Sequence, residues 1–142
     1  MEQQTYEFPD IPINVTVPHQ VEYEVEIVPV LLPMPVCICN TNKFTVIRCI
    51  CNIGLFRANE FEAKNLTRPI QTFTPTIILE VFYTRTDLAA LEKEDDKLKL
   101  AYWNLSKWVI IFEDEYQNLL RGSSVTVQID SFLGDPTLGW GR

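Results

Sequence analysis

The predicted fold is decided by residues 76–132, which read TIILEVFYTRTDLAALEKEDDKLKLAYWNLSKWVIIFEDEYQNLLRGSSVTVQIDSF. Residues 76–83 are almost continuously apolar and rich in β-branched and aromatic side chains, which is typical of a central strand covered on both faces. Residues 125–132 alternate between apolar and polar side chains, which predicts a second strand. The part between these strands predicts a helix.

Apolar side chains in the middle of this stretch recur every three or four residues, as they do along one side of an amphipathic helix. They are Leu91, Leu98, Tyr102, Leu105, Val109, Phe112, Tyr116 and Leu119. One helix over residues 88–120 would be roughly 50 Å long at about 1.5 Å per residue, too long for a small domain. We therefore expect a break at the acidic residues 94–96, and a main helix from Lys97 to Leu120 that ends before Gly122.

The first half of the chain reads as strands and loops. In residues 21–28 an apolar residue alternates with Glu22, Glu24 and Glu26, which predicts a strand with one apolar face and one face of carboxylates. That acidic face is either solvated or matched to a basic surface on a partner. Residues 44–51 predict a further strand.

Together these elements predict one α+β domain, a mostly antiparallel β-sheet packed by one long amphipathic helix. A length of 142 residues suits a single domain. We expect an extended N-terminal arm in residues 1–20, the core in residues 21–132, and an irregular C-terminal tail in residues 133–142, because prolines interrupt the first segment and glycines the last. Residues 57–74 predict a long connection that either docks onto a partner or simply runs over the surface.

Composition and charge exclude several classes of protein. The chain has 46% hydrophobic and 22% charged residues, which is ordinary for a globular domain, and its net charge is −7. Its 12 lysines and arginines are scattered, so no basic stripe predicts nucleic-acid binding. No apolar run reaches the ~18–20 residues that span a bilayer. The polar and acidic N-terminus is unlike a signal peptide, so we expect the chain to stay in the cytoplasm.

The four cysteines come closest to a metal-binding motif. Cys37 and Cys39 are separated by one isoleucine, and so are Cys49 and Cys51. Zinc sites usually place two residues between paired cysteines, because a turn then brings both sulfurs to one ion. With one intervening residue in a strand, both thiols lie on the same side about 7 Å apart. The pattern therefore favours small buried hydrophobes in strands, with a zinc site or disulfides as the alternatives.

The sequence predicts no catalytic, cofactor-binding or metal-binding residue. His19 is the one histidine, and no nucleophile in a recognisable motif accompanies it. Trp103 and Trp108 are five residues apart, so on a helix they would point to different sides, and we expect one at a rim or interface. Trp140 in the tail packs either into its own domain or into a neighbour.

The order of elements in the second half resembles that of tail-terminator or tail-completion proteins of tailed bacteriophages. The shared pattern is the strand of residues 76–83, an acidic turn, the helix of residues 97–120, the strand of residues 125–132 and a flexible tail. Members of that family are small α+β subunits that form a ring, usually six-fold, which closes the tail tube at the neck. The chain departs from the family because it lacks an early helix and begins with a proline-rich arm.

The resemblance implies a non-enzymatic structural subunit of a phage neck or tail, assembled in the host cytoplasm and located in the virion. Its partners would be further copies of itself in a homo-oligomeric ring and neighbouring virion proteins, with no cofactor, nucleic acid or membrane. The residues themselves suggest which positions lie at interfaces: Glu22, Glu24, Glu26, Trp108 and Trp140. Deleting residues 133–142 is expected to leave the fold intact and to weaken assembly.

Two other classes of function fit the same sequence. A different virion component, such as a cement protein or a baseplate subunit, would share the irregular ends and the long connection; the symmetry of the assembly would separate it. A small cytoplasmic ligand-binding or metal-binding protein, or a small enzyme, would need a concave pocket in which polar groups converge.

Overall fold

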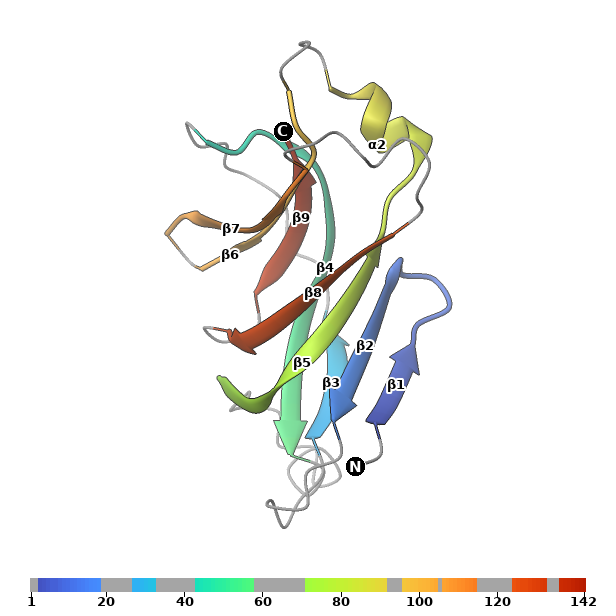
Figure 1. The fold of residues 1–142 in the computed structure, drawn as a ribbon, viewed down its shortest axis with the longest axis vertical. Coiled ribbons are helices and arrows are strands. Elements are labelled where there is room, and N and C mark those ends of the chain that lie inside the picture. Colours follow the sequence, from blue (N-terminus) through green and yellow to red (C-terminus); the bar gives the residue numbers. More distant parts are fainter. Residues whose placement is uncertain are drawn as a thin grey trace.

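The computed structural model describes residues 3–18, 27–32, 43–57, 71–91, 96–104, 106–114, 124–132 and 136–142. In these residues the chain forms two antiparallel β-sheets that pack face to face, with one short helix at one end (Figure 1). The architecture is a β-sandwich, in which side chains between the two sheets form the core.

The first sheet, called sheet A, has four strands in the order β1-β2-β5-β8. Their bounds are Gln3–Glu7 for β1, Ile13–Pro18 for β2, Thr72–Phe82 for β5 and Ser124–Ser131 for β8. The strands predicted at residues 76–83 and 125–132 are thus confirmed as β5 and β8, and they pair with each other. The prediction that β5 is covered on both faces is wrong for residues 76–81, because Ile77, Leu79 and Val81 are buried on the inner face whereas residues 76, 78 and 80 are partly exposed.

The second sheet, called sheet B, has five strands in the order β3-β4-β9-β6-β7. Their bounds are Ile27–Leu32 for β3, Val46–Arg57 for β4, Thr137–Gly141 for β9, Lys99–Trp103 for β6 and Trp108–Glu113 for β7. Each neighbouring pair is antiparallel. The C-terminal strand β9 therefore lies in the middle of this sheet, between β4 and β6.

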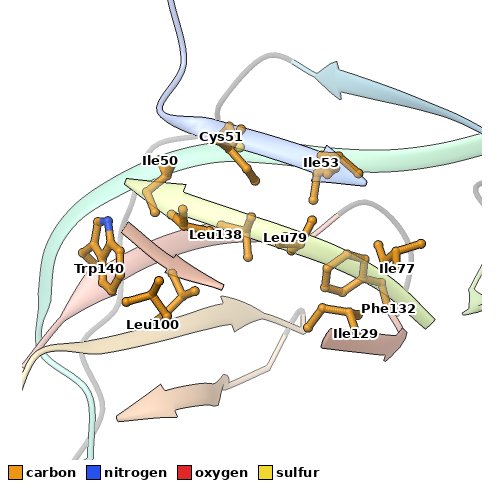
Figure 2. Close-up of a cluster of buried hydrophobic side chains, with 14 of the residues drawn as sticks. Ile50, Cys51, Ile53, Ile77, Leu79, Leu100, Ile129, Phe132, Leu138 and Trp140 are labelled. Carbon is orange, nitrogen blue, oxygen red and sulfur yellow. The ribbon is translucent and has the colours of Figure 1, made fainter. Parts of the chain in front are cut away.

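The core is built from apolar side chains that alternate along the strands of both sheets. Figure 2 shows its central part, formed by Ile50, Cys51, Ile53, Ile77, Leu79, Leu100, Ile129, Phe132, Leu138 and Trp140. Burying one such aliphatic side chain contributes about 1.5–3 kcal/mol relative to leaving it exposed. The packing of sheet A on sheet B is therefore the main source of stability.

The prediction of a long amphipathic helix over residues 97–120 is wrong for the residues that the structure describes. There the chain forms β6, a turn and β7, which pair as an antiparallel hairpin. Both segments are filled with β-branched and aromatic residues, which favour strands. In addition, Leu98, Leu100 and Tyr102 repeat with period two on the core side. The described fold is an all-β sandwich with one short helix, so the predicted α+β class is wrong.

The turn between β6 and β7 is held by the side chain of Asn104. Its Oδ1 accepts hydrogen bonds from the backbone N–H groups of Ser106 (3.1 Å) and Lys107 (2.9 Å). The Asn104 N–H in turn donates to the Lys107 carbonyl at 3.0 Å. Asparagine stabilises turns in this way, and here it divides the apolar stripe that resembled a helix into two strands.

Both ends of the chain belong to sheets, so the predicted extended arms are wrong as well. The N-terminal segment forms the hairpin of β1 and β2, in which Thr5 pairs with Thr16. At the other end every residue of β9 is buried. A strand of five residues with two glycines carries little local β signal, and its pairing on both sides determines its conformation.

The helix α2 (Arg85–Ala89) follows β5 directly and begins with a capping box. Thr84 is the N-cap; its backbone N–H donates to Asp87 Oδ2 at 2.8 Å, and its Oγ1 accepts from the Asp87 N–H at 3.3 Å. Such reciprocal bonds satisfy the free N–H groups of the first turn. No helix among the described residues is long and apolar enough to cross a membrane.

Gly141 makes room for the Phe44 ring on the outer side of β9. A Cβ added there would lie 2.6 Å from Phe44 Cε1 and 2.6 Å from the Thr45 carbonyl oxygen. Gly141→Ala is therefore expected to lower the free energy of unfolding by about 1–3 kcal/mol, as overpacking does. Gly139→Ala is the matched control, because its Cβ would meet the Trp108 ring at 3.2 Å and need a smaller shift. Urea unfolding measures both variants, and equal losses would contradict this packing.

Candidate interaction surface

An aromatic cluster lies on the outer side of sheet B, the side that faces away from the core. Along β6, Leu100 and Tyr102 pack into the core, whereas Ala101 and Trp103 belong to this outer cluster. The cluster consists of Phe44, Ala101 and Trp108, which are buried, and Val46, Cys49, Trp103 and Ile110, which are partly buried. We call these seven residues the aromatic surface.

Three rings form the centre of the aromatic surface. Trp103 and Trp108 are cross-strand partners in the hairpin, with ring centroids 5.5 Å apart in an edge-to-face arrangement. The ring centroid of Phe44 lies 4.9 Å from that of Trp108. Aromatic pairs of this kind contribute about 0.5–1.5 kcal/mol beyond their buried area. Trp108 itself is 8% exposed, so the remaining accessible aromatic area is mainly that of Trp103.

Positive charge surrounds the aromatic surface. Lys43 and Lys107 are exposed and directly precede Phe44 and Trp108 in the chain. Lys99, on the same side of β6, donates from Nζ to the Lys43 carbonyl at 2.8 Å. Glu113, an acidic residue on β7 opposite Lys99, lies 3.6 Å from Lys97 in a partly exposed ion pair of small energetic value.

Sheet A carries the opposite charge. Its four strands contain Glu7, Glu80 and Asp130 but no lysine or arginine. Glu80 accepts hydrogen bonds from Asn14 Nδ2 at 3.1 Å and from Ser124 Oγ at 2.9 Å, both from neighbouring strands. The outer side of sheet A is therefore acidic and polar, whereas the outer side of sheet B is aromatic and bordered by lysines.

A polar cluster joins the two sheets at the end where α2 lies. Arg48 of β4 forms a two-pronged contact with Asp87 of α2, through Nε to Oδ1 at 2.6 Å and Nη2 to Oδ2 at 2.8 Å. The Arg48 side chain is 35% exposed and that of Asp87 2% exposed. Trp140 Nε1 donates to the Phe82 carbonyl at 3.1 Å, beside this pair. These groups satisfy one another, which indicates a stabilising contact and not a reactive site.

The pKa of the Asp87 carboxyl lies below its ordinary value. Burial by itself raises this pKa, but the hydrogen bonds from Arg48 and Thr84 and the charge of Arg48 together outweigh burial. Asp87 is therefore ionised at neutral pH and is held as one half of a charge-assisted pair.

The two cysteines of β4 have different environments. Cys51 lies in the core, as the sequence predicts, and burial raises the pKa of its thiol to about 12, so it is inert at neutral pH. Cys49 packs into the aromatic surface and is disulfide-bonded. Cys37 and Cys39 lie outside the described residues, and the described residues hold no cluster of histidine, cysteine or carboxylate groups able to bind a metal ion.

The residues predicted at interfaces are separated by the structure. Trp108 belongs to the aromatic surface, whereas Trp140 is 0% exposed and packs in the core, so it has no surface to offer a partner. Glu22, Glu24, Glu26 and His19 lie outside the described residues. Phe44 and the flanking lysines were not predicted, because only the pairing of β4, β9 and β6 brings them beside the two tryptophans.

Comparisons of the chain with protein-family models, with curated proteins and with solved structures found no match.

Proposed function

We propose that this chain is a non-enzymatic structural subunit that stacks on further copies of itself, with the outer side of sheet B against the outer side of sheet A of the next copy. The observation that carries the proposal is the aromatic surface. A sheet that faces water on one side normally shows polar side chains there, whereas sheet B shows Trp103 and its neighbours. Exposed aromatic residues are enriched where proteins bind one another.

The charges of the two sheets select a second copy as the partner. Lys43, Lys99 and Lys107 around the aromatic surface complement Glu7, Glu80 and Asp130 on sheet A. Complementary charges steer association and fix its orientation. Because the two contacting surfaces differ, the contact is heterologous, and repetition of it produces a ring or an open filament.

The proposal keeps assembly as the function and leaves the phage neck aside. The resemblance to tail-terminator proteins depended on a helix over residues 97–120, and β6 and β7 occupy the described part of that segment. The two sheet faces support self-association without that resemblance.

Light scattering across protein concentrations tests the proposal. The mass is expected to rise between about 1 µM and 1 mM, and to fall when ionic strength is increased to about 0.5 M, because salt screens exposed charges. Lys107→Glu and Glu7→Lys are each expected to weaken association roughly tenfold. Arg85→Glu is the matched control, since Arg85 is exposed at the start of α2, away from both faces.

Mixing the two charge variants tests the heterologous geometry. Lys107→Glu retains an intact sheet A, and Glu7→Lys retains an intact sheet B, so an equal mixture is expected to have a higher mean mass than either variant alone at the same total concentration. A wild-type chain that stays monomeric over the whole concentration range contradicts the proposed function. So does an Arg85→Glu variant that weakens association as much as Lys107→Glu.

A further inference from the structure

Among the described residues the sandwich has four edge strands, and their protection is unequal. Sheet A ends at β1 and β8, and sheet B ends at β3 and β7. An edge strand presents unpaired backbone N–H and C=O groups to which another strand can add. Proteins therefore protect their edges with short strands, proline, lysine or β-bulges.

Three of the four edges carry such a device. β1 is only five residues long. β3 contains Pro29, which has no N–H to offer. β7 is bulged, because Leu100 pairs with Phe112 and Ala101 with Ile110, which leaves Ile111 without a partner residue on β6.

The fourth edge, β8, has none of these devices from Ser124 to Ile129, and the irregularity of its pairing beyond Ile129 comes from additional residues on β5. It has eight residues, SVTVQIDS, without proline, lysine or arginine. Its register with β5 is regular from Ser124 to Ile129. In the part of the chain that the structure describes, no strand pairs with the other side of β8. Since a strand bonded on one side directs half of its backbone groups outward, β8 is a regular edge ready for strand addition.

We propose that β8 pairs antiparallel with β8 of a second copy about a two-fold axis, which joins two four-stranded sheets into one continuous sheet. This interface differs from the face-to-face contact proposed above and does not depend on it. It is isologous, so each strand must complement itself when reversed.

The sequence of β8 is self-complementary in one register. With Val127 opposite Val127 on the axis, Val125 faces Ile129 on the core side, so apolar residues meet apolar residues. On the outer side Thr126 faces Gln128, a pair that can form a hydrogen bond, and Ser124 faces Asp130, so polar residues meet polar residues. Asp130 never lies opposite Asp130, so no like charges oppose each other directly.

Neighbouring registers are less favourable. If the two-fold axis passed through Gln128, Val125 on the core side would lie opposite the polar Ser131. If one strand slid by a single residue along the other, core-facing residues would lie opposite outward-facing ones. The partly buried Val127 would also gain cover from its copy in the preferred register. The occupant that best fits this edge is therefore a second β8, centred at Val127.

Charge substitutions at two exposed positions test the register. Thr126 and Gln128 are exposed and directly opposite each other only in the proposed dimer. Thr126→Lys with Gln128→Lys places like charges opposite each other twice, and is expected to weaken the dimer at least tenfold. Thr126→Lys with Gln128→Glu places opposite charges there, and is expected to tighten the dimer several-fold.

Both double variants are to be made in the Lys107→Glu chain, in which the face-to-face contact is weakened, so that the edge is measured separately. Light scattering is expected to give a limiting mass of two copies for the Lys107→Glu chain, with thermal melting to confirm that each variant is folded. A folded Lys107→Glu chain that stays monomeric at millimolar concentration overturns the edge proposal. Equal dissociation constants for the two double variants overturn it as well. Neither result bears on whether Lys107→Glu weakens stacking relative to the wild type, so the two proposals fail separately.

Discussion

Replacing Trp140 by alanine is expected to lower the free energy of unfolding by about 3–5 kcal/mol, the range for large aromatic residues in cores. Trp140 is 0% exposed, lies opposite Leu100 of β6, and meets the Tyr83 ring edge-to-face at 5.9 Å. It also donates its indole N–H to the Phe82 carbonyl of sheet A. Because 1 kcal/mol shifts the melting temperature of a domain of this size by roughly 3 °C, Trp140→Ala should lower the melting temperature by roughly 10–17 °C.

Deleting residues 136–142 should have a still larger effect and abolish the folded state. The deletion removes β9, so β4 and β6 each lose one of their two neighbouring strands, and sheet B is divided in the middle. This outcome is opposite to the one that the sequence predicted for removal of the tail. Circular dichroism during heating measures it: the deleted chain should show no cooperative transition. A transition at the wild-type temperature would mean that β9 is not part of the core.

Trp103→Ala is the matched control for Trp140→Ala. Trp103 is partly exposed on the outer side of sheet B and has no place in the core between the sheets. Its loss removes an aromatic pair worth about 0.5–1.5 kcal/mol plus a fraction of buried area. A Trp103 variant that is as unstable as the Trp140 variant would contradict the different burial of the two side chains.

Arg48→Met is expected to destabilise the protein by about 3 kcal/mol at pH 7, the lower part of the range for breaking a buried ion pair. The lower part applies because the Arg48 side chain is 35% exposed. The cost arises at Asp87, which is 2% exposed and would keep only the Thr84 donors for its charge. Lys97→Met is the control, because it breaks the exposed Lys97–Glu113 pair, which is worth under about 1 kcal/mol.

The effect of Arg48→Met should depend on pH in a defined direction. In the wild type the pKa of Asp87 is lower in the folded chain than in the unfolded chain. The pair therefore stabilises the fold above the unfolded pKa, about 3.9 for aspartate, and this contribution is lost as the pH falls through the folded pKa. Urea unfolding at several pH values should show the wild type and Arg48→Met converging below about pH 4. A difference that stays constant from neutral pH to acid would contradict the assigned role of Asp87.

Local sequence predicted the strands whose pattern is unambiguous. Residues 76–83 and 125–132 became β5 and β8, and the apolar Cys51 position became part of the core. In these segments one periodicity fits and the alternative does not, so the choice needs no information from the rest of the chain. The net charge and the scattered basic residues were likewise readable directly.

The candidate interaction surface was predicted only in part. Trp108 was expected at an interface, and it lies in the aromatic surface beside Trp103. Phe44 carried no signal, because it joins the tryptophans only where Gly139 and Gly141 of β9 bring the neighbouring strands together. The relative position of Trp103 and Trp108 also depends on whether they lie on a helix or on strands. On a helix their side chains would point to different sides, whereas the hairpin places them opposite each other.

Tertiary structure alone decided the conformation of residues 99–113. Leu98, Tyr102, Val109 and Phe112 fit both a helical stripe and two alternating strands joined at Asn104, so local periodicity could not choose. The choice was made by β9, which pairs with β6 from more than thirty positions further along the chain. The sequence by itself determined which side chains are apolar and where the unambiguous strands lie. The assembly of sheet B decided the rest, because a strand satisfies its backbone hydrogen bonds only when its neighbours are in place.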